Sequence, residues 1–143
     1  MTQVEWAKQY DLPIVIHSRE SMDLIIELLK PVRHSRLRGI FHCFSGTVAQ
    51  AEAAIELGFL LGIGGVLTFK KSGLDAVLSE IDLKHLVLET DAPYLAPTPF
   101  RGKRNESSYL LKVAEKLAEV KGVNLNEVAE VTTQNALQLL GTL

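Results

Sequence analysis

The sequence has one cysteine, little net charge and no long apolar run, and each shortage excludes a class of protein. Cys43 is the only cysteine among 143 residues, so an internal disulfide is impossible and a reducing cytoplasm is the expected location. No apolar segment is long enough to cross a membrane, and no basic start followed by an apolar run predicts a signal peptide. These shortages favour a cytoplasmic globular protein.

The charge balance restricts how the chain could meet nucleic acid. Fifteen Lys and Arg against 17 Asp and Glu give a net charge of −2, so there is no global attraction to a polyanion. Any nucleic-acid contact must therefore depend on local basic clusters. Hydrophobic residues make up 47% of the chain and can supply one core. Without repeats or a linker, we expect a single domain over residues 1–143.

Short β-rich runs alternate with amphipathic helical stretches along the chain. Thr47 with Gln50 forms a capping-box pattern, Asn124 is placed to cap the last helix, and Gly122 is placed to end the helix before it. Helices are expected over residues 2–10, 20–30, 47–58, 72–79, 107–121 and 124–141, and strands over 14–16, 39–44, 59–64 and 86–89. An irregular, proline-containing loop is expected over residues 92–106.

This order of elements predicts an α/β fold. Strands that are apolar on both faces and separated by helices indicate a parallel sheet covered by helices. Four such strands would make half of an eight-stranded barrel, which takes roughly 250 residues when complete. A four-stranded half would leave two apolar edge strands and an open inner face, which is a liability for a soluble monomer.

Three residues able to hold a metal each lie where an apolar run ends. His17 follows Ile14-Val15-Ile16, His42 follows Gly39-Ile40-Phe41, and Asp91 follows the fourth strand. Polar side chains at the carboxyl ends of parallel strands are how barrel enzymes assemble a site. The pattern therefore predicts part of a metal-dependent hydrolase. The alternative for each lone histidine is a hydrogen-bonded structural role.

Five segments together resemble the TatD family of metal-dependent deoxyribonucleases. They are Ile16-His17-Ser18-Arg19-Glu20, Phe41-His42-Cys43-Phe44-Ser45-Gly46, Leu88-Glu89-Thr90-Asp91-Ala92-Pro93-Tyr94-Leu95-Ala96-Pro97, Arg101-Gly102-Lys103-Arg104-Asn105-Glu106 and Thr132-Thr133-Gln134-Asn135-Ala136. The resemblance implies the C-terminal half of a TIM-type (β/α)8 barrel. It also implies hydrolysis of phosphodiester bonds in DNA, either single-stranded or at duplex ends.

The resemblance assigns roles to the residues at the strand ends. His17 and His42 match the two later histidine ligands of the family, and Asp91 matches the aspartate that binds metal and activates water. The implied cofactor is a divalent ion, Mg, Mn or Zn, with one or two ions in the complete enzyme.

Other polar residues near these motifs have both a functional and a neutral interpretation. Glu89 faces the same side as the aspartate two residues later, and either orients a metal ligand or is a polar residue of the barrel interior. Arg19 either binds a phosphate through its planar guanidinium or lies in solvent at the start of a helix. Arg101, Lys103 and Arg104 form the densest basic cluster and are expected to contact a nucleic-acid backbone, although charge runs are usually solvated surface.

Three further positions have a simple structural interpretation. Strand alternation predicts that Cys43 points away from His42 as a small buried hydrophobe. Asn105 is interpreted as a helix cap. The glycine-rich stretch 62–65 does not match a nucleotide loop and is expected either to give room at the barrel top or to turn the chain.

The chain departs from the family pattern, and the departure limits the expected activity. The family's His-x-His pair and its glutamate between the halves are not in this sequence, and neither His34 nor His85 replaces them. A truncated product, late start codon or expressed fragment is therefore favoured over a natural half-barrel, and the chain alone is expected to be inactive. The alternative is a non-catalytic half-barrel that self-associates, as a homodimer, through its exposed edges.

Overall fold

Four parallel strands form one sheet in the order β1-β2-β3-β4 in the computed structural model, which describes residues 1–141. The strands are β1 (Ile14–His17), β2 (Gly39–His42), β3 (Phe59–Ile63) and β4 (Leu86–Leu88). The helices are α1 (Thr2–Tyr10), α2 (Met22–Leu29), α3 (Val48–Glu56), α4 (Leu74–Glu80), α5 (Leu110–Lys121) and α6 (Leu125–Leu140), with 3-10 segments η1 (Lys30–Val32), η2 (Gly65–Thr68), η3 (Leu83–His85) and η4 (Ser107–Tyr109). The predicted α/β class with four parallel strands is confirmed.

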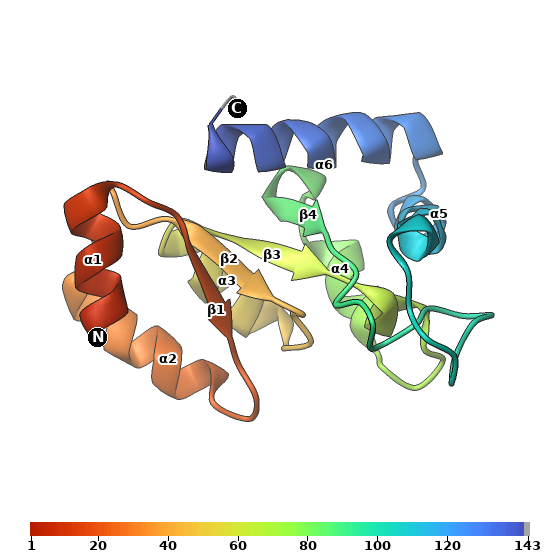
Figure 1. Ribbon diagram of the computed structural model, residues 1–143, viewed down its shortest axis with the longest axis horizontal. Coiled ribbons are helices and arrows are strands. Elements are labelled where there is room, and N and C mark those ends of the chain that lie inside the picture. Colours follow the sequence, from red (N-terminus) through yellow and green to blue (C-terminus); the bar gives the residue numbers. More distant parts are fainter. Residues whose placement is uncertain (142–143) are drawn as a thin grey trace.

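One face of the sheet packs on helices and supplies much of the core. Phe41 and Phe59 meet edge to face with ring centroids 5.2 Å apart, and Leu61 is buried beside them. In Figure 1, α1 and α2 lie at the β1 end of the sheet, and α5 and α6 lie at the β4 end. Alternate side chains point to the other face, where Val15 is 66% exposed. An open inner face of the expected kind is therefore present at β1.

The helix ends predicted from capping residues are confirmed. Thr47 Oγ1 accepts a hydrogen bond from Gln50 N, and Gln50 Oε1 accepts one from Thr47 N, which completes the capping box. Gly122 ends α5 in the left-handed conformation with φ 66°. Asn124 Oδ1 accepts a hydrogen bond of 2.9 Å from Glu127 N at the start of α6.

Several predicted boundaries shift: α4 begins at Leu74 instead of Ser72, and α5 begins at Leu110 after a 3-10 segment over Ser107–Tyr109. At two other boundaries a non-glycine residue adopts the left-handed conformation. The helix predicted from Glu20 begins at Met22, since Glu20 has φ 55°. The second strand ends at His42 instead of Phe44, since Cys43 has φ 51°. An isolated left-handed residue continues neither a helix nor a strand. The turn at Cys43 shapes the site described below.

The described helices are too short to suggest a membrane span. The longest of those in residues 1–141, α6, has 16 residues. A helix needs about 20 apolar residues to cross a bilayer, and none in the described part is long and apolar enough. The expected cytoplasmic location stays a prediction.

Asn135 joins α6 to the amino end of β4. Its side chain is buried, and Nδ2 donates hydrogen bonds to the carbonyls of Leu83 (3.0 Å) and Leu86 (2.7 Å). Leu83 is the first residue of η3, and Leu86 is the first residue of β4, which follows η3 directly. Asn135 therefore fixes where the fourth strand begins, and with it the position of the strand's carboxyl end.

We expect Asn135→Ala to lower the free energy of unfolding by about 1–3 kcal/mol, because the carbonyls of Leu83 and Leu86 each lose a buried hydrogen bond. Urea denaturation followed by circular dichroism measures the change. Gln134→Ala, at the exposed neighbouring position of α6, is the matched control and should stay within about 0.5 kcal/mol of the parent. Equal stability of the two variants would contradict this account of Asn135.

Candidate metal centre

The imidazole of His42 lies between two carboxylates at the carboxyl edge of the sheet. Its Nδ1 is 2.8 Å from Glu89 Oε1, and its Nε2 is 3.4 Å from Asp91 Oδ1. His17 pairs with His42 in the strand register, and the two ring centroids are 5.6 Å apart. The three side chains predicted to gather at this edge therefore lie together. Their role as metal ligands stays a prediction.

The carboxylate of Glu89 reaches across β3 to the turn that follows β2. Besides its approach to His42, Glu89 Oε1 accepts a hydrogen bond of 2.7 Å from Cys43 N. Gly62 of β3 makes the crossing possible, since a Cβ at that position would lie 2.2 Å from Glu89 Oε2. The expectation that these glycines give room at the barrel top is thus met at Gly62. Glu89 holds the end of β2 and the ring of His42 through one oxygen.

The buried side chain of Asn105 holds the loop that contains Asp91, and we call its two hydrogen bonds the Asn105 clamp. Asp91 has φ 56°, so its side chain does not follow simple strand alternation. Asn105 is 3% exposed, and its Nδ2 donates hydrogen bonds of 2.7 Å to the carbonyls of both Thr90 and Tyr94. The prediction that Asn105 is a helix cap is wrong, because the cap position of η4 is Glu106. Asn105 instead fixes the loop on both sides of Asp91.

The donor atoms at this edge fit a divalent ion in part. Among residues 1–141, no three His, Cys, Asp or Glu side chains already stand in the geometry of a metal site. Two donor atoms, however, have the spacing of metal ligands. Ligands bonded at about 2.1 Å to a tetrahedral ion lie about 3.4 Å apart, and His42 Nε2 is 3.4 Å from Asp91 Oδ1. Imidazole and carboxylate together suit Zn, Mn or Mg. His17 is the imidazole placed to join them.

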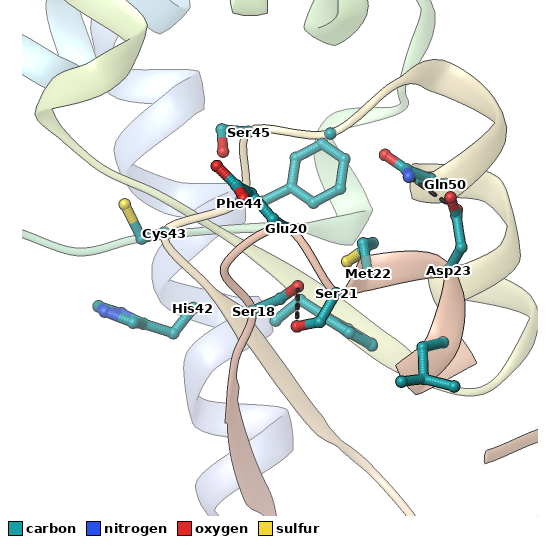
Figure 2. Close-up of a pocket in the computed structure, with 13 residues that line it drawn as sticks. Ser18, Glu20, Ser21, Met22, Asp23, His42, Cys43, Phe44, Ser45 and Gln50 are labelled. Carbon is teal, nitrogen blue, oxygen red and sulfur yellow. Dashed lines mark hydrogen bonds between the residues drawn. The ribbon is translucent and has the colours of Figure 1, made fainter. Parts of the chain in front are cut away.

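A pocket of about 620 Å³ opens beside His42, between the segments that follow β1 and β2. Figure 2 shows His42 and Cys43 on one side of this pocket, with Asp23 and Gln50 on the other. Gln50 Nε2 donates a hydrogen bond of 2.7 Å to Asp23 Oδ1 there. Glu20 also lines the pocket, so two carboxylates face the space. The negative charge of these carboxylates disfavours binding of a polyanion in this pocket. A polyanion would bind more favourably elsewhere along the carboxyl edge of the sheet.

Cys43 does not point away from His42 as strand alternation predicts. The two side chains extend to the same side in Figure 2, because β2 ends at His42 and Cys43 turns into the left-handed conformation. Burial, together with the negative charges of Glu89 and Asp91, raises the pKa of the Cys43 thiol to about 11. At neutral pH the thiol stays protonated, which agrees with the expectation that it is no nucleophile.

The four predicted substrate-binding residues are exposed and lie apart from this group. Arg19 follows β1, while Arg101, Lys103 and Arg104 lie in the loop after Asp91. Within residues 1–141, no hydrogen bond or ion pair joins any of these four to the histidines and carboxylates of the site. Their position past the carboxyl ends of β1 and β4 is the one predicted. Their contact with substrate stays a prediction.

Two features of this edge were missed from the sequence. The clamp by Asn105 was missed because its acceptors are backbone carbonyls 11 and 15 residues away. Lys70 and Lys71 were missed although a dibasic pair follows the third predicted strand closely, which was a usable signal. Both lie on segments that leave the carboxyl edge of the sheet.

A parallel sheet with polar side chains at its carboxyl edge is typical of α/β-barrel enzymes. The family model described as TatD related DNase matches residues 1–141, so the chain belongs to the TatD family. The family resemblance predicted from the five segments is confirmed.

Curated relatives agree with this assignment. The chain is 42% identical over 138 residues to the uncharacterized metal-dependent hydrolase YabD of Bacillus subtilis (strain 168), covering 96% of this chain and 54% of YabD. It is 39% identical over 144 residues to the 3'-5' ssDNA/RNA exonuclease TatD of Edwardsiella piscicida, covering 96% of this chain and 55% of that protein. The chain therefore spans about half the length of these relatives.

Solved structures of TatD proteins also match nearly all of this chain and about half of their own length. The TatD homologue YjjV of Escherichia coli K12 matches with a TM-score of 0.92 at 33% identity, over 99% of this chain and 54% of that one. A TatD family hydrolase of Entamoeba histolytica matches with a TM-score of 0.83 at 22% identity, over 98% and 55%, and shows the fold alone. The prediction of a partial TatD-type barrel is confirmed.

The pKa of Cys43 gives a test of the charges at this edge. Since only the thiolate reacts, alkylation by iodoacetamide at pH 8 should be at least tenfold slower in the folded chain than in urea, and its rate should rise until about pH 11. Mass spectrometry of this single cysteine follows the reaction. Glu89→Gln removes one cause of the raised pKa and should move the profile to lower pH. A folded chain that reacts at pH 8 as fast as the unfolded one would contradict the assignment.

Proposed function

We propose that this chain supplies the later ligands of a divalent-metal hydrolase that cleaves phosphodiester bonds in DNA. The observation that carries the proposal is the approach of His42 Nε2 to Asp91 Oδ1 at 3.4 Å, with the ring of His17 5.6 Å from that of His42. His17, His42 and Asp91 would hold one or two ions of Mg, Mn or Zn. A bound divalent ion lowers the pKa of a water molecule and offsets negative charge on a phosphoryl oxygen.

The protein groups have separate tasks in this proposal. Asp91 accepts the proton of the attacking water, because its carboxylate is partly exposed and held in place by the Asn105 clamp. Glu89 acts as a positioning residue: beside Nδ1 of His42, it fixes the ring so that Nε2 faces Asp91. Its carboxylate is 18% exposed, so water competes little for it.

The substrate is the part of the proposal that depends on a relative. The Edwardsiella piscicida protein is described as a 3'-5' ssDNA/RNA exonuclease. We infer a DNA strand or duplex end as substrate here, with Arg19, Arg101, Lys103 and Arg104 along its phosphates. These contacts carry no sequence information, so the expected cleavage is independent of sequence.

We expect the 143-residue chain alone to show little or no Mn²⁺-dependent cleavage of single-stranded DNA, because the His-x-His pair and glutamate of the family pattern are not in it. Co-expression with the N-terminal half of a relative such as Bacillus subtilis YabD should restore nucleotide release and metal content together. Asp91→Asn should abolish the restored cleavage. Glu89→Gln should raise the Mn²⁺ concentration for half-maximal binding about 10- to 100-fold.

Asp75→Asn is the matched control, since Asp75 is an exposed carboxylate at the start of α4. It should leave both cleavage and Mn²⁺ binding unchanged. Robust cleavage by the chain alone would contradict the expected inactivity. Cleavage that survives Asp91→Asn in the co-expressed complex would contradict the role given to Asp91.

A second candidate is a non-catalytic half-barrel that pairs with a second copy of itself. Its support is the exposed apolar surface at the β1 edge, where Val15 is 66% and Leu12 is 58% exposed. β1 and β4 are both edges of the sheet in the described part of the chain, and an exposed edge strand can pair with another strand. A homodimer would cover this surface through one symmetric contact.

Sedimentation velocity at micromolar concentrations tests this pairing. We expect the parent chain to self-associate and Val15→Lys to sediment as a monomer, because a charge on the inner face opposes burial. Leu24→Lys is the control, since Leu24 is 62% exposed on α2 and lies away from that face. A parent chain that sediments as a sharp monomer would exclude the second candidate.

A further inference from the structure

A second hollow lies where the segments leaving β3 and β4 meet. It has a volume of about 540 Å³ and is lined by Val66, Phe69, Lys70, Lys71, Ser72, Thr98 and Arg101. We call it the basic pocket. η2 follows β3, and the loop with Thr98 follows β4, so both walls lie beyond the carboxyl ends of parallel strands. His42 and Asp91 lie at this same edge.

The walls of the basic pocket are tied to each other. Thr98 N donates to Thr68 Oγ1 at 2.8 Å, and Thr98 Oγ1 donates to the carbonyl of Thr68 at 3.1 Å. Gly65 packs against the loop so closely that a Cβ there would lie 2.0 Å from the carbonyl oxygen of Leu95. The pocket is therefore formed before any ligand arrives, which lowers the entropic cost of binding.

Three cations meet in the basic pocket without neutralising partners. Lys70, Lys71 and Arg101 are exposed, and none of the ion pairs within residues 1–141 includes them. The guanidinium carbon of Arg101 lies 3.8 Å from the centre of the Phe69 ring. A stacked guanidinium keeps its N–H edges free, and those edges match two oxygens of a phosphate. The charge here is opposite to that of the pocket beside His42, which Glu20 and Asp23 line.

We propose that the basic pocket is a subsite for a single-stranded nucleic acid, binding phosphates that flank the one to be cleaved. Arg101, Lys70 and Lys71 bind phosphate oxygens, and the exposed side of Phe69 with Val66 offers apolar surface to a sugar or base. Backbone charge and apolar contact together bind a single strand without reading its sequence. The inference rests on the proposed function and extends it with two lysines on a different segment from Arg101.

Binding can be measured separately from cleavage. Fluorescence anisotropy of a 5'-fluorescein-labelled twelve-residue oligo(dT) with the 143-residue chain in EDTA reports binding without metal. At low salt the Lys70→Gln/Lys71→Gln double variant should bind at least fivefold more weakly than the parent. The slope of log Kd against log salt should fall by about 1.4, since each single-strand phosphate contact accounts for about 0.7. Arg101→Lys, which keeps the positive charge but loses the planar guanidinium that can bind two phosphate oxygens, should also weaken binding.

Arg33→Gln/Arg36→Gln is the matched control, since it removes two exposed charges just before β2, at the amino edge of the sheet. It should change affinity less than twofold. The inference is overturned if this control weakens binding as much as the lysine variant, or if the parent shows no binding below 1 mM protein. If the lysine variant binds more weakly but the YabD complex shows no cleavage, the proposed hydrolase is refuted and the subsite stands. If the complex cleaves DNA in a metal-dependent way but the lysine variant binds as the parent does, the subsite is refuted and the hydrolase stands.

Discussion

The contact between the Glu89 carboxylate and the ring of His42 sets the arrangement of the whole carboxyl edge. One oxygen of Glu89 is 2.8 Å from His42 Nδ1 and accepts a hydrogen bond from Cys43 N, so it holds both the imidazole and the turn behind it. The approach depends on Gly62, because any side chain there would occupy the place of the carboxylate. With Nδ1 facing Glu89, the ring presents Nε2 to Asp91. A carboxylate behind a histidine in this way commonly fixes the orientation of a metal ligand.

The same edge carries two regions of opposite charge. The histidine–carboxylate group suits a cation, while Lys70, Lys71 and Arg101 suit phosphates. The overall charge of −2 hides this separation, since it averages over the whole surface. Both regions are built on backbone that is fixed in advance, by Asn105 on one side and by the tie between Thr68 and Thr98 on the other. Preformed donors and charges of this kind act without reorganisation.

Local signals in the sequence predicted the elements, while long-range contacts decided the details of the site. The capping box at Thr47 and the apolar strands could be predicted because each depends on neighbouring residues. The meeting of His17, His42 and Asp91 could be predicted because parallel strands share one edge. Left-handed conformations at Cys43 and Asp91 could not, since their surroundings impose them and no glycine marks them. The clamp by Asn105 and the meeting of Lys70 with Arg101 likewise join segments that only the fold brings together.

The proposed metal site depends most on His42 and Asp91 sharing one cation while Glu89 stays behind the ring. X-ray diffraction from crystals of the chain in complex with the N-terminal half of a relative, soaked in Mn²⁺ and recorded to locate anomalous scattering, tests this directly. We expect an anomalous peak within bonding distance of both His42 Nε2 and Asp91 Oδ1, with Glu89 still beside Nδ1. A peak bound to other residues, or crystals at saturating Mn²⁺ with no peak between these two atoms, would contradict it.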